Sequence, residues 1–250
     1  MNLYQSRPLI EPILLTAVQI LTFNNAQKLT NASGFFFQRE HRLFLVSSRH
    51  VMVDKISKHF PDRIEIELHT DPKNFSQSTG FSVPLYREGN ALWRQGRDSS
   101  GDIDVALIEI DRAALPKNTV YRAFTPAHLQ ESLEQIEVGT ALSVIGFPLG
   151  FHDALYHMPV VRHAVVASSF GMRFQGMGFF LTDARTHRGT SGAPVVMRAK
   201  TAHSSLAELP WILLGIHSAR MDMGTRDADI DEALGLNCAW YADILMTLSE

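Results

Sequence analysis

The chain has 250 residues, of which 45% are hydrophobic and 20% charged, and its formal net charge is −3. The length suffices for one large domain or two small ones, and the composition excludes a disordered chain. The near-neutral charge balance excludes a general attraction to nucleic acid or to an anionic membrane, so we expect neither as a partner. The single cysteine, Cys238, excludes an intrachain disulfide and a multi-cysteine metal site. It favours a reducing compartment, and we expect a cytoplasmic protein.

The first half of the chain is rich in short β-like segments. The apolar stretch at 12–23 is shorter than the ~20 residues of a membrane span and lacks the features of a secretory signal, so it predicts a buried strand. β-branched and aromatic residues between turn-forming stretches such as 70–79 and 96–101 predict six strands. These predicted strands are 13–23, 34–38, 43–47, 64–68, 81–85 and 105–110.

The connection that follows, 111–139, predicts a short amphipathic helix. Thr125 followed by Pro126 is typical of a helix start, because proline fits the first helical position. Leu129, Leu133 and Ile136 then follow at helical spacing.

A second set of six strands is predicted at 141–145, 160–168, 178–182, 193–197, 211–217 and 236–241. The spacing of Trp240, Ile244, Leu245 and Leu248 then predicts a C-terminal helix. The fold class is therefore all-β, with two six-stranded antiparallel barrels, a short linker helix and a terminal helix. We expect one domain over 1–250, with an N-terminal barrel at about 10–112, a linker at 113–138 and a C-terminal barrel at 139–250.

The segment 182–196, TDARTHRGTSGAPVV, places Ser191 in a tight turn between Gly189 and Gly192. Glycines allow successive backbone N–H groups to point inward together, and an acyl-transfer enzyme uses such donors to hold the oxyanion of its intermediate. The nucleophile elbow of α/β-hydrolases is excluded, because Ala193 stands where its second glycine would be and a strand follows.

A serine nucleophile needs a base and a carboxylate that orients the base. His50 follows the predicted buried strand at 43–47, where its ring can project into a cleft. Asp104 directly precedes the apolar run at 105–110, and Asp102 is the second candidate, one step back in the turn. The chain order His50, Asp104, Ser191 excludes the subtilisin and α/β-hydrolase orders.

Together with 138–150 (VGTALSVIGFPLG) and 214–218 (LGIHS), these segments resemble the chymotrypsin-fold serine proteases, above all the catalytic domain of the HtrA type. The resemblance implies peptide-bond hydrolysis by His50, Asp104 and Ser191, with the N–H groups of Gly189 and Ser191 as the oxyanion hole. Thr190 stands where animal trypsins carry the aspartate that binds the freed N-terminus. Activity is therefore expected to be intrinsic or controlled by a regulatory protein partner.

Two residues are candidates for the pocket that receives the substrate side chain. In glutamyl endopeptidases and the related viral cysteine proteases, a threonine and a histidine at places similar to Thr186 and His217 bind an acidic or amide side chain. A pocket for small or apolar side chains is the alternative.

His152 and His157 are too few ligands for a metal site, and we expect no metal and no cofactor. The alternative to a serine endopeptidase is a non-enzymatic or regulatory interaction module on a protease fold.

Overall fold

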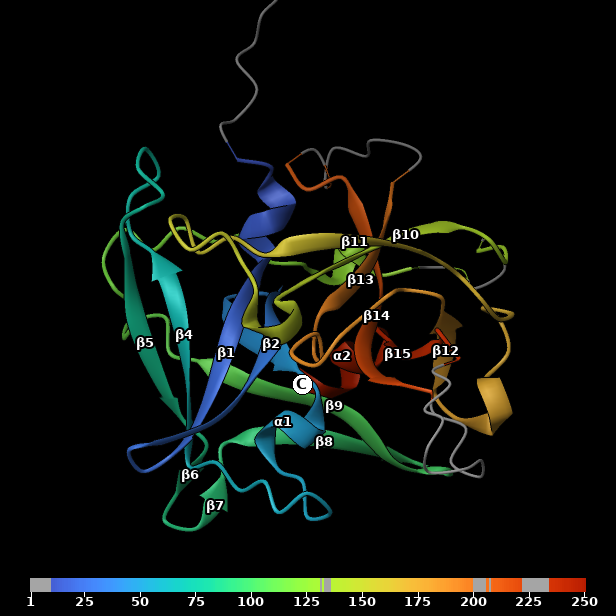
Figure 1. The fold of residues 1–250 in the computed structure, drawn as a ribbon, viewed down its shortest axis with the longest axis horizontal. Coiled ribbons are helices and arrows are strands. Elements are labelled where there is room, and N and C mark those ends of the chain that lie inside the picture. The colour runs from blue at the N-terminus through green and yellow to red at the C-terminus, as the bar shows by residue number, and fades with distance from the viewer. Residues whose placement is uncertain (1–9, 131, 133–135, 200–205, 207, 222–233) are drawn as a thin grey trace, which may run out of the picture.

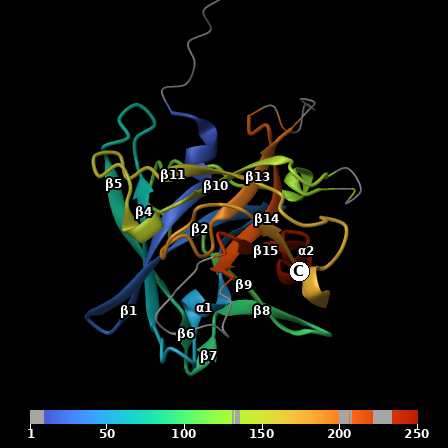
Figure 2. The same ribbon diagram turned by 45° about the vertical axis from the view of Figure 1, so that its right-hand side comes forward.

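Two antiparallel sheets lie side by side in the computed structural model, one built from the first half of the chain and one from the second (Figure 1; turned by 45° in Figure 2). The structure describes residues 10–130, 132, 136–199, 206, 208–221 and 234–250. This arrangement confirms the predicted all-β fold with few short helices.

The N-terminal sheet has seven strands in the order β5-β4-β1-β2-β3-β9-β8. Its strands are β1 (Ala17–Asn24), β2 (Gln27–Arg39), β3 (Arg42–Ser47), β4 (Arg63–His69), β5 (Ser78–Pro84), β8 (Trp93–Asp98) and β9 (Gly101–Ile110). A small hairpin of β6 (Tyr86–Arg87) and β7 (Asn90–Ala91) lies between β5 and β8 in the chain. β4 shows why such segments form strands, because Ile64, Ile66 and Leu68 alternate with polar residues and are buried.

The C-terminal sheet has six strands in the order β11-β10-β13-β14-β15-β12. They are β10 (Ala141–Gly146), β11 (Val160–Val165), β12 (Phe179–Thr182), β13 (Pro194–Arg198), β14 (Trp211–Arg220) and β15 (Asn237–Tyr241). One apolar cluster joins the two sheets, since Phe35 and Phe37 of β2 share it with Ile145 of β10 and Ile216 of β14. The interface between the sheets is therefore part of the core and holds their strand ends in place.

The predicted terminal helix is present as α2 (Ile244–Leu248), which buries Leu245 and Leu248. Arginines of the N-terminal sheet hold this end of the chain. Arg39 donates to the carbonyl of Met246 at 2.6 Å, and Arg42 and Arg94 donate to the carbonyl of Glu250 at 3.1 and 2.6 Å.

The linker differs from its prediction. Among its described residues it forms the 3-10 turn η2 (Pro126–His128) and no longer helix; the N–H of Thr125 donates to Nδ1 of His128 at 3.0 Å. Leu129 is already extended, with φ −79° and ψ 151°, and bridges to Leu213 of β14, so the helical spacing is not used there. Leu133 lies outside the described residues.

Two details of the first half also differ. Residues Pro12–Thr16 form the 3-10 helix η1, so the strand begins at Ala17 rather than at 13. The stretch at 96–101 belongs partly to the hairpin of β8 and β9 rather than to a loop. β8 reads WRQGRD and was not predicted, because an edge strand rich in charged residues carries no apolar alternation.

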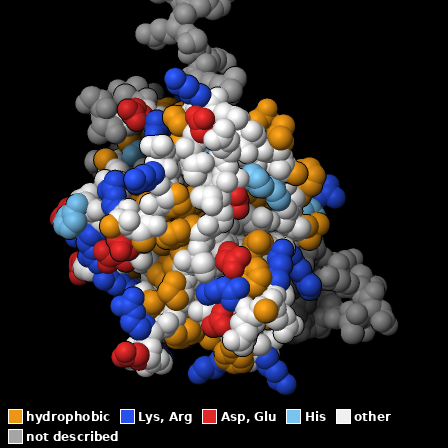
Figure 3. Space-filling view, turned by 90° about the vertical axis from the view of Figure 1, so that its left-hand side faces the viewer, with side chains coloured by type: hydrophobic (Ala, Val, Ile, Leu, Met, Phe, Trp, Pro, Cys, Tyr) orange, Lys and Arg blue, Asp and Glu red, His pale blue; other side chains and the backbone are white. Residues whose placement is uncertain are grey.

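Positive and negative side chains are interspersed on the face shown in Figure 3, without a large area of one sign. In the part of the chain that the structure describes, no helix is long and apolar enough to span a membrane.

Candidate active site

His50 and Asp104 meet at the inner edge of the N-terminal sheet. His50 lies in α1 (Arg49–Met52), a single turn that follows β3, and Asp104 lies in the neighbouring strand β9. The backbone N–H of His50 donates to Oδ1 of Asp104 at 2.9 Å, and the ring Nδ1 lies 2.7 Å from Oδ2. The carboxylate therefore fixes both the position and the tautomer of the imidazole, which leaves Nε2 unprotonated in the neutral ring.

The structure distinguishes the two candidate carboxylates. Asp102 lies next to the β8–β9 turn, paired with Arg97 of β8, and its carboxylate is 3.9 Å from that arginine. Asp102 is half exposed, whereas the side chain of Asp104 is only 19% exposed. The geometry brings only Asp104 to His50.

A third residue completes the environment of this carboxylate. Ser218 of β14 donates its hydroxyl to Oδ2 of Asp104 at 2.5 Å. Burial alone would raise the pKa of Asp104, but the hydrogen bonds from His50 and Ser218 and the charge of His50 lower it below its ordinary value. Burial likewise opposes the charged form of His50, and the hydrogen bond and charge of Asp104 outweigh it, so the pKa of His50 is raised above 6.5.

Ser191 lies across the interface, in the loop that precedes β13. Its flanking glycines have left-handed backbones, with φ of +91° at Gly189 and +85° at Gly192. A Cβ at Gly192 would overlap the carbonyl of Ser33 and the side chain of Ser47, and one at Gly189 would overlap the side chain of Asn31. Both positions therefore require glycine for two reasons: the left-handed backbone conformation and the close approach of neighbouring atoms.

The hydroxyl of Ser191 donates to the backbone carbonyl of Ser218 at 3.0 Å. No hydrogen bond joins it to the ring of His50 in this rotamer, although Ser191 and His50 line the same cleft. A hydrogen bond between the two candidate residues would require the Ser191 hydroxyl to leave the carbonyl of Ser218.

The nucleophile loop is fastened to β2 by Ser33. Its N–H donates to the carbonyl of Ser191 at 2.9 Å, and its hydroxyl donates to the carbonyl of Gly189 at 2.8 Å. The N–H groups of Gly189 and Ser191 have no hydrogen-bond acceptor among the described residues. Both carbonyls are thus occupied while the two donors stay free.

Thr186 and His217 are both buried, at 5% and 2% exposure, but no hydrogen bond joins their side chains. Thr186 lines a cavity of about 400 Å³ whose lining does not include His217. The Thr186 hydroxyl donates to Oδ1 of Asn237 at 2.5 Å, while the amide nitrogen of Asn237 donates to the carbonyl of Ala184 at 2.5 Å. Nδ1 of His217 has no partner, and burial, with repulsion from His50, lowers the pKa of His217 to about 4.

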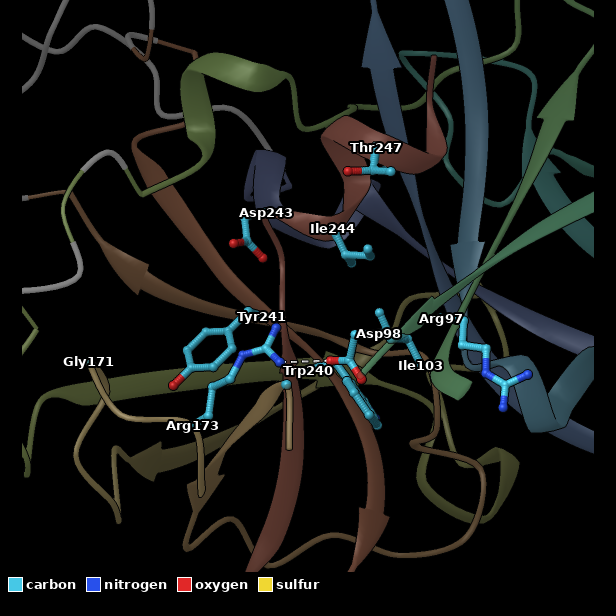
Figure 4. A pocket seen from close by; sticks show the side chains of 11 residues that line it. Arg97, Asp98, Ile103, Gly171, Arg173, Trp240, Tyr241, Asp243, Ile244 and Thr247 are labelled. Atoms are coloured by element: carbon cyan, nitrogen blue, oxygen red, sulfur yellow. Dashed lines mark hydrogen bonds and ion pairs between the residues drawn. The ribbon is translucent and has the colours of Figure 1, made fainter. Parts of the chain in front are cut away.

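A second cavity, of about 340 Å³, lies between the β8–β9 hairpin, the loop after β11 and α2 (Figure 4). Arg173 reaches across it to Asp98 at 2.9 Å, and the Ser100 hydroxyl donates to the carbonyl of Gly176 at 2.9 Å. These contacts join the β8–β9 hairpin, which precedes Asp104, to the C-terminal half. The lining of this cavity does not include His50, Asp104 or Ser191.

No group of three or more His, Cys, Asp or Glu side chains that could hold a metal ion occurs among the described residues. The rings of His152 and His157 stack at 5.8 Å, and Nδ1 of His152 lies 2.7 Å from the carbonyl of Gly150. This pair is therefore part of a loop's internal packing.

Sequence reasoning did not identify Ser218, Ser33 or Asn237 as parts of the site. Ser218 could have been found from the sequence, because it is a polar residue that directly follows the run LLGIH of a predicted buried strand. Ser33 and Asn237 had none, because their partners lie 156 and 51 residues away in the chain.

Comparison with known proteins agrees with this geometry. The model of the trypsin-like peptidase domain matches residues 32–201. The solved structure of the HtrA-type protease AlgW with tripeptide is similar at 17% identity and a TM-score of 0.57, over 94% of this chain and 59% of that one. A serine endoprotease from Yersinia pestis is similar at 15% identity and a TM-score of 0.53, over 94% and 62%.

The chain thus spans about three fifths of the length of these structures. At these identities the likeness shows the chymotrypsin-like fold. A search of curated proteins by sequence finds no match.

Proposed function

The chain belongs to the trypsin-like peptidase family, and from this premise we propose that it is a serine endopeptidase in which Ser191, His50 and Asp104 hydrolyse peptide bonds. The observation that carries the proposal is the double hydrogen bond that aligns His50 on Asp104 beside Ser191. A polypeptide substrate is supported by the tripeptide in the similar HtrA-type structure.

The reaction begins when Ser191 turns from the carbonyl of Ser218 toward Nε2 of His50. Its oxygen attacks the carbonyl carbon of the substrate while the hydroxyl proton passes to His50. The charged imidazole then donates this proton to the leaving amine, the C–N bond breaks, and an acyl-enzyme remains. Water attacks the acyl carbon in the second half, with His50 again accepting and returning a proton, which restores Ser191 and releases the acid.

The free N–H groups of Gly189 and Ser191 would hold the oxyanion of both tetrahedral intermediates. Each of these N–H groups shares its peptide plane with the carbonyl of the preceding residue. The carbonyl of Arg188 accepts from the N–H of Leu149 at 2.5 Å and that of Thr190 accepts from the N–H of Ala193 at 2.9 Å, so both planes are held before substrate arrives. Donors that need no reorganisation stabilise the transition state more than they stabilise the substrate.

The test combines labelling and turnover. The wild-type chain is expected to react with a fluorophosphonate probe and to cleave denatured casein, whereas Ser191→Ala is expected not to label. Ser191→Ala and His50→Ala should each lower kcat by a factor on the order of 10⁴ to 10⁶ with the fold intact by circular dichroism. A well-folded wild-type chain that neither labels nor cleaves would favour the alternative, a regulatory interaction module.

The proposal extends to Thr186 and His217 as residues that select the substrate side chain before the scissile bond. The hydroxyl proton of Thr186 is committed to Asn237, so Thr186 can only accept a further hydrogen bond. A neutral His217 can donate one, because its lowered pKa keeps it uncharged at pH 7. His217 does not line the cavity of Thr186, so both residues act on one substrate side chain only where that side chain extends beyond the cavity. One acceptor and one neutral donor then suit a carboxamide better than a carboxylate.

A peptide library tests this preference. Cleavage after Gln that weakens in His217→Ala and in Thr186→Val supports it, because an unpaired buried polar group discriminates strongly. Preference for Val, Ala or Leu would favour the apolar pocket instead.

A further inference from the structure

The cleft beside Ser191 carries an uneven distribution of charge. His50 and Ser191 both line its cavity, which has a volume of about 550 Å³. Three cationic side chains also line it: Lys28 from β2, Lys58 from the loop after α1, and Arg188 from the nucleophile loop. Residues from three separate parts of the chain therefore place positive charge around one hollow.

These cations are not neutralised within the structure. All three are exposed, and no carboxylate of the described residues lies within 4.0 Å of their nitrogens. The chain as a whole carries a net charge of −3, so the positive charge of the cleft is a local feature. A cleft that gathers one sign of charge attracts the opposite sign in its ligand.

Among the described residues that line the cleft, Asp54 is the one acidic residue. Its carboxylate accepts hydrogen bonds within its own loop, from the hydroxyl of Ser57 at 2.5 Å and from the N–H groups of Ile56 and Ser57 at 3.1 and 3.3 Å. Those oxygens are directed into the loop, and the cleft keeps a net positive charge.

The edge of β2 beside the cleft has no strand partner among the described residues, since residues 28–33 pair with β1 and the pairing with β3 begins at Phe35. Thr30 directs its backbone toward β1, where its N–H bonds to the hydroxyl of Thr22 at 3.1 Å. Ser33 directs its N–H the opposite way, to Ser191. Because strand backbones alternate, Asn31 presents its backbone on the same side as Ser33, along the lining of the cleft. A peptide emerging from Ser191 could add to this edge.

The half of the substrate that occupies this cleft follows from the reaction. His50 lines the cleft, and its ring must reach the nitrogen of the leaving amine. The cavity of Thr186 shares no lining residue with the cleft, so the residue before the scissile bond has a separate place. The cleft therefore receives the residues after the scissile bond.

We infer that Lys28, Lys58 and Arg188 select substrates with acidic residues in the second and third positions after the scissile bond. The inference rests on the proposed endopeptidase function. Exposed charge pairs are individually weak, so three together should favour Glu over Lys by about three- to tenfold in kcat/KM. The preference should shrink in 1 M salt, where the screening length falls to ~3 Å.

The experiment uses internally quenched peptides built on a sequence that the full chain cleaves in casein, with Glu-Glu, Gln-Gln or Lys-Lys at those two positions. The ratio of kcat/KM between the Glu and Lys peptides is measured for the wild type and for the double variant Lys28→Glu/Lys58→Glu. The matched control is Lys73→Glu/Lys117→Glu, which makes the same change of charge at exposed residues outside the cleft.

A ratio above three in the wild type and the control, lost or inverted in the cleft variant, supports the inference. Equal cleavage of the three peptides by the wild type overturns it while leaving the endopeptidase proposal intact. An equal change in the control variant also overturns it, because net charge rather than the cleft would then be responsible. If the wild type cleaves none of the peptides and no casein, both proposals fail.

Discussion

The two halves of the molecule prepare the candidate active site by different physical means. The N-terminal sheet contributes side chains, His50 and Asp104, which two hydrogen bonds align, with a third from Ser218. The C-terminal half contributes mainly backbone, since Gly189 and Gly192 give Ser191 its place and leave two N–H groups free. The first half thus depends on ionisation and the second on conformation. Substitutions should separate these two contributions. Removing a charge in the N-terminal half should lower kcat, whereas replacing a glycine in the C-terminal half should lower the free energy of unfolding.

The largest effect is expected from removing the charge on the N-terminal side. Asp104→Asn should lower kcat by a factor of about 10⁴, because the amide no longer favours the imidazole tautomer that accepts a proton. Asp102→Asn is the matched control, since Asp102 makes only a long, exposed contact to Arg97 and its loss should change kcat by less than about twofold. Steady-state kinetics on one peptide substrate measures both. The assignment would be wrong if the control were the inactive variant.

The conformational side of the comparison is tested by Gly192→Ala. The added Cβ would overlap the carbonyl of Ser33 and the side chain of Ser47. The alanine would also have to adopt the left-handed backbone conformation of Gly192. Left-handed strain and overpacking together should lower the free energy of unfolding by about 3 kcal/mol.

The control for this variant is Gly139→Ala. Gly139 also has a left-handed backbone, with φ of +85°, but nothing lies within 4 Å of its added Cβ. Its free energy of unfolding, measured in urea, should fall by only about 1 kcal/mol, from backbone strain alone. Equal losses for the two variants would show that close packing against Ser33 and Ser47 contributes nothing.

The pH dependence sharpens the ionisation side. The reaction needs neutral His50, whose pKa is raised above 6.5, so kcat/KM should fall about tenfold per pH unit as pH drops below that raised value. The same shift has the opposite sign for folding. A raised pKa contributes stability that is fully present below 6.5 and is lost as pH rises through the folded pKa. A kcat/KM profile whose midpoint lies below 6.5 would contradict the effect of Asp104.

The smallest effect is expected at Cys238. Burial, with the charge of Asp104, raises the pKa of this thiol to about 11, so it stays protonated and unreactive at pH 7. Cys238→Ala should leave kcat unchanged, and iodoacetamide should not inhibit the native chain. Inhibition by iodoacetamide that disappears in Cys238→Ala would show that the thiol reaches the active site.

Much of the fold could be predicted from the sequence because strand-forming segments are local. Each of the predicted segments in both halves contains or overlaps a strand of the structure. The failures have physical causes. β8 is a polar edge strand stabilised by its pairing with β9, and the linker residue Leu129 is extended because it bridges to β14 rather than continuing the turn. The first depends on pairing in a hairpin and the second on a residue 84 positions later in the chain, and neither leaves a pattern of apolar residues.

The candidate site divides in the same way. The contact between His50 and Asp104 could be predicted, since residue type, strand context and chain order all favour it. The rotamer of Ser191 could not, because it depends on the carbonyl of Ser218, 27 residues away. The commitment of the Thr186 hydroxyl to Asn237 was equally inaccessible, and it changes the chemistry expected of that pocket.

The hydrogen bonds from Arg39, Arg42 and Arg94 to the backbone carbonyls at 246–250 join parts of the chain that are synthesised at different times. These arginines belong to strands that have all been synthesised by Ile110, whereas their acceptors follow 136 to 140 residues later. At a synthesis rate of ~5–20 residues per second, on the order of ten seconds pass between the completion of these strands and the synthesis of the carbonyl groups that their arginines bind. The half that is made first is therefore completed last, and the emerging chain carries His50 and Asp104 well before it carries a nucleophile.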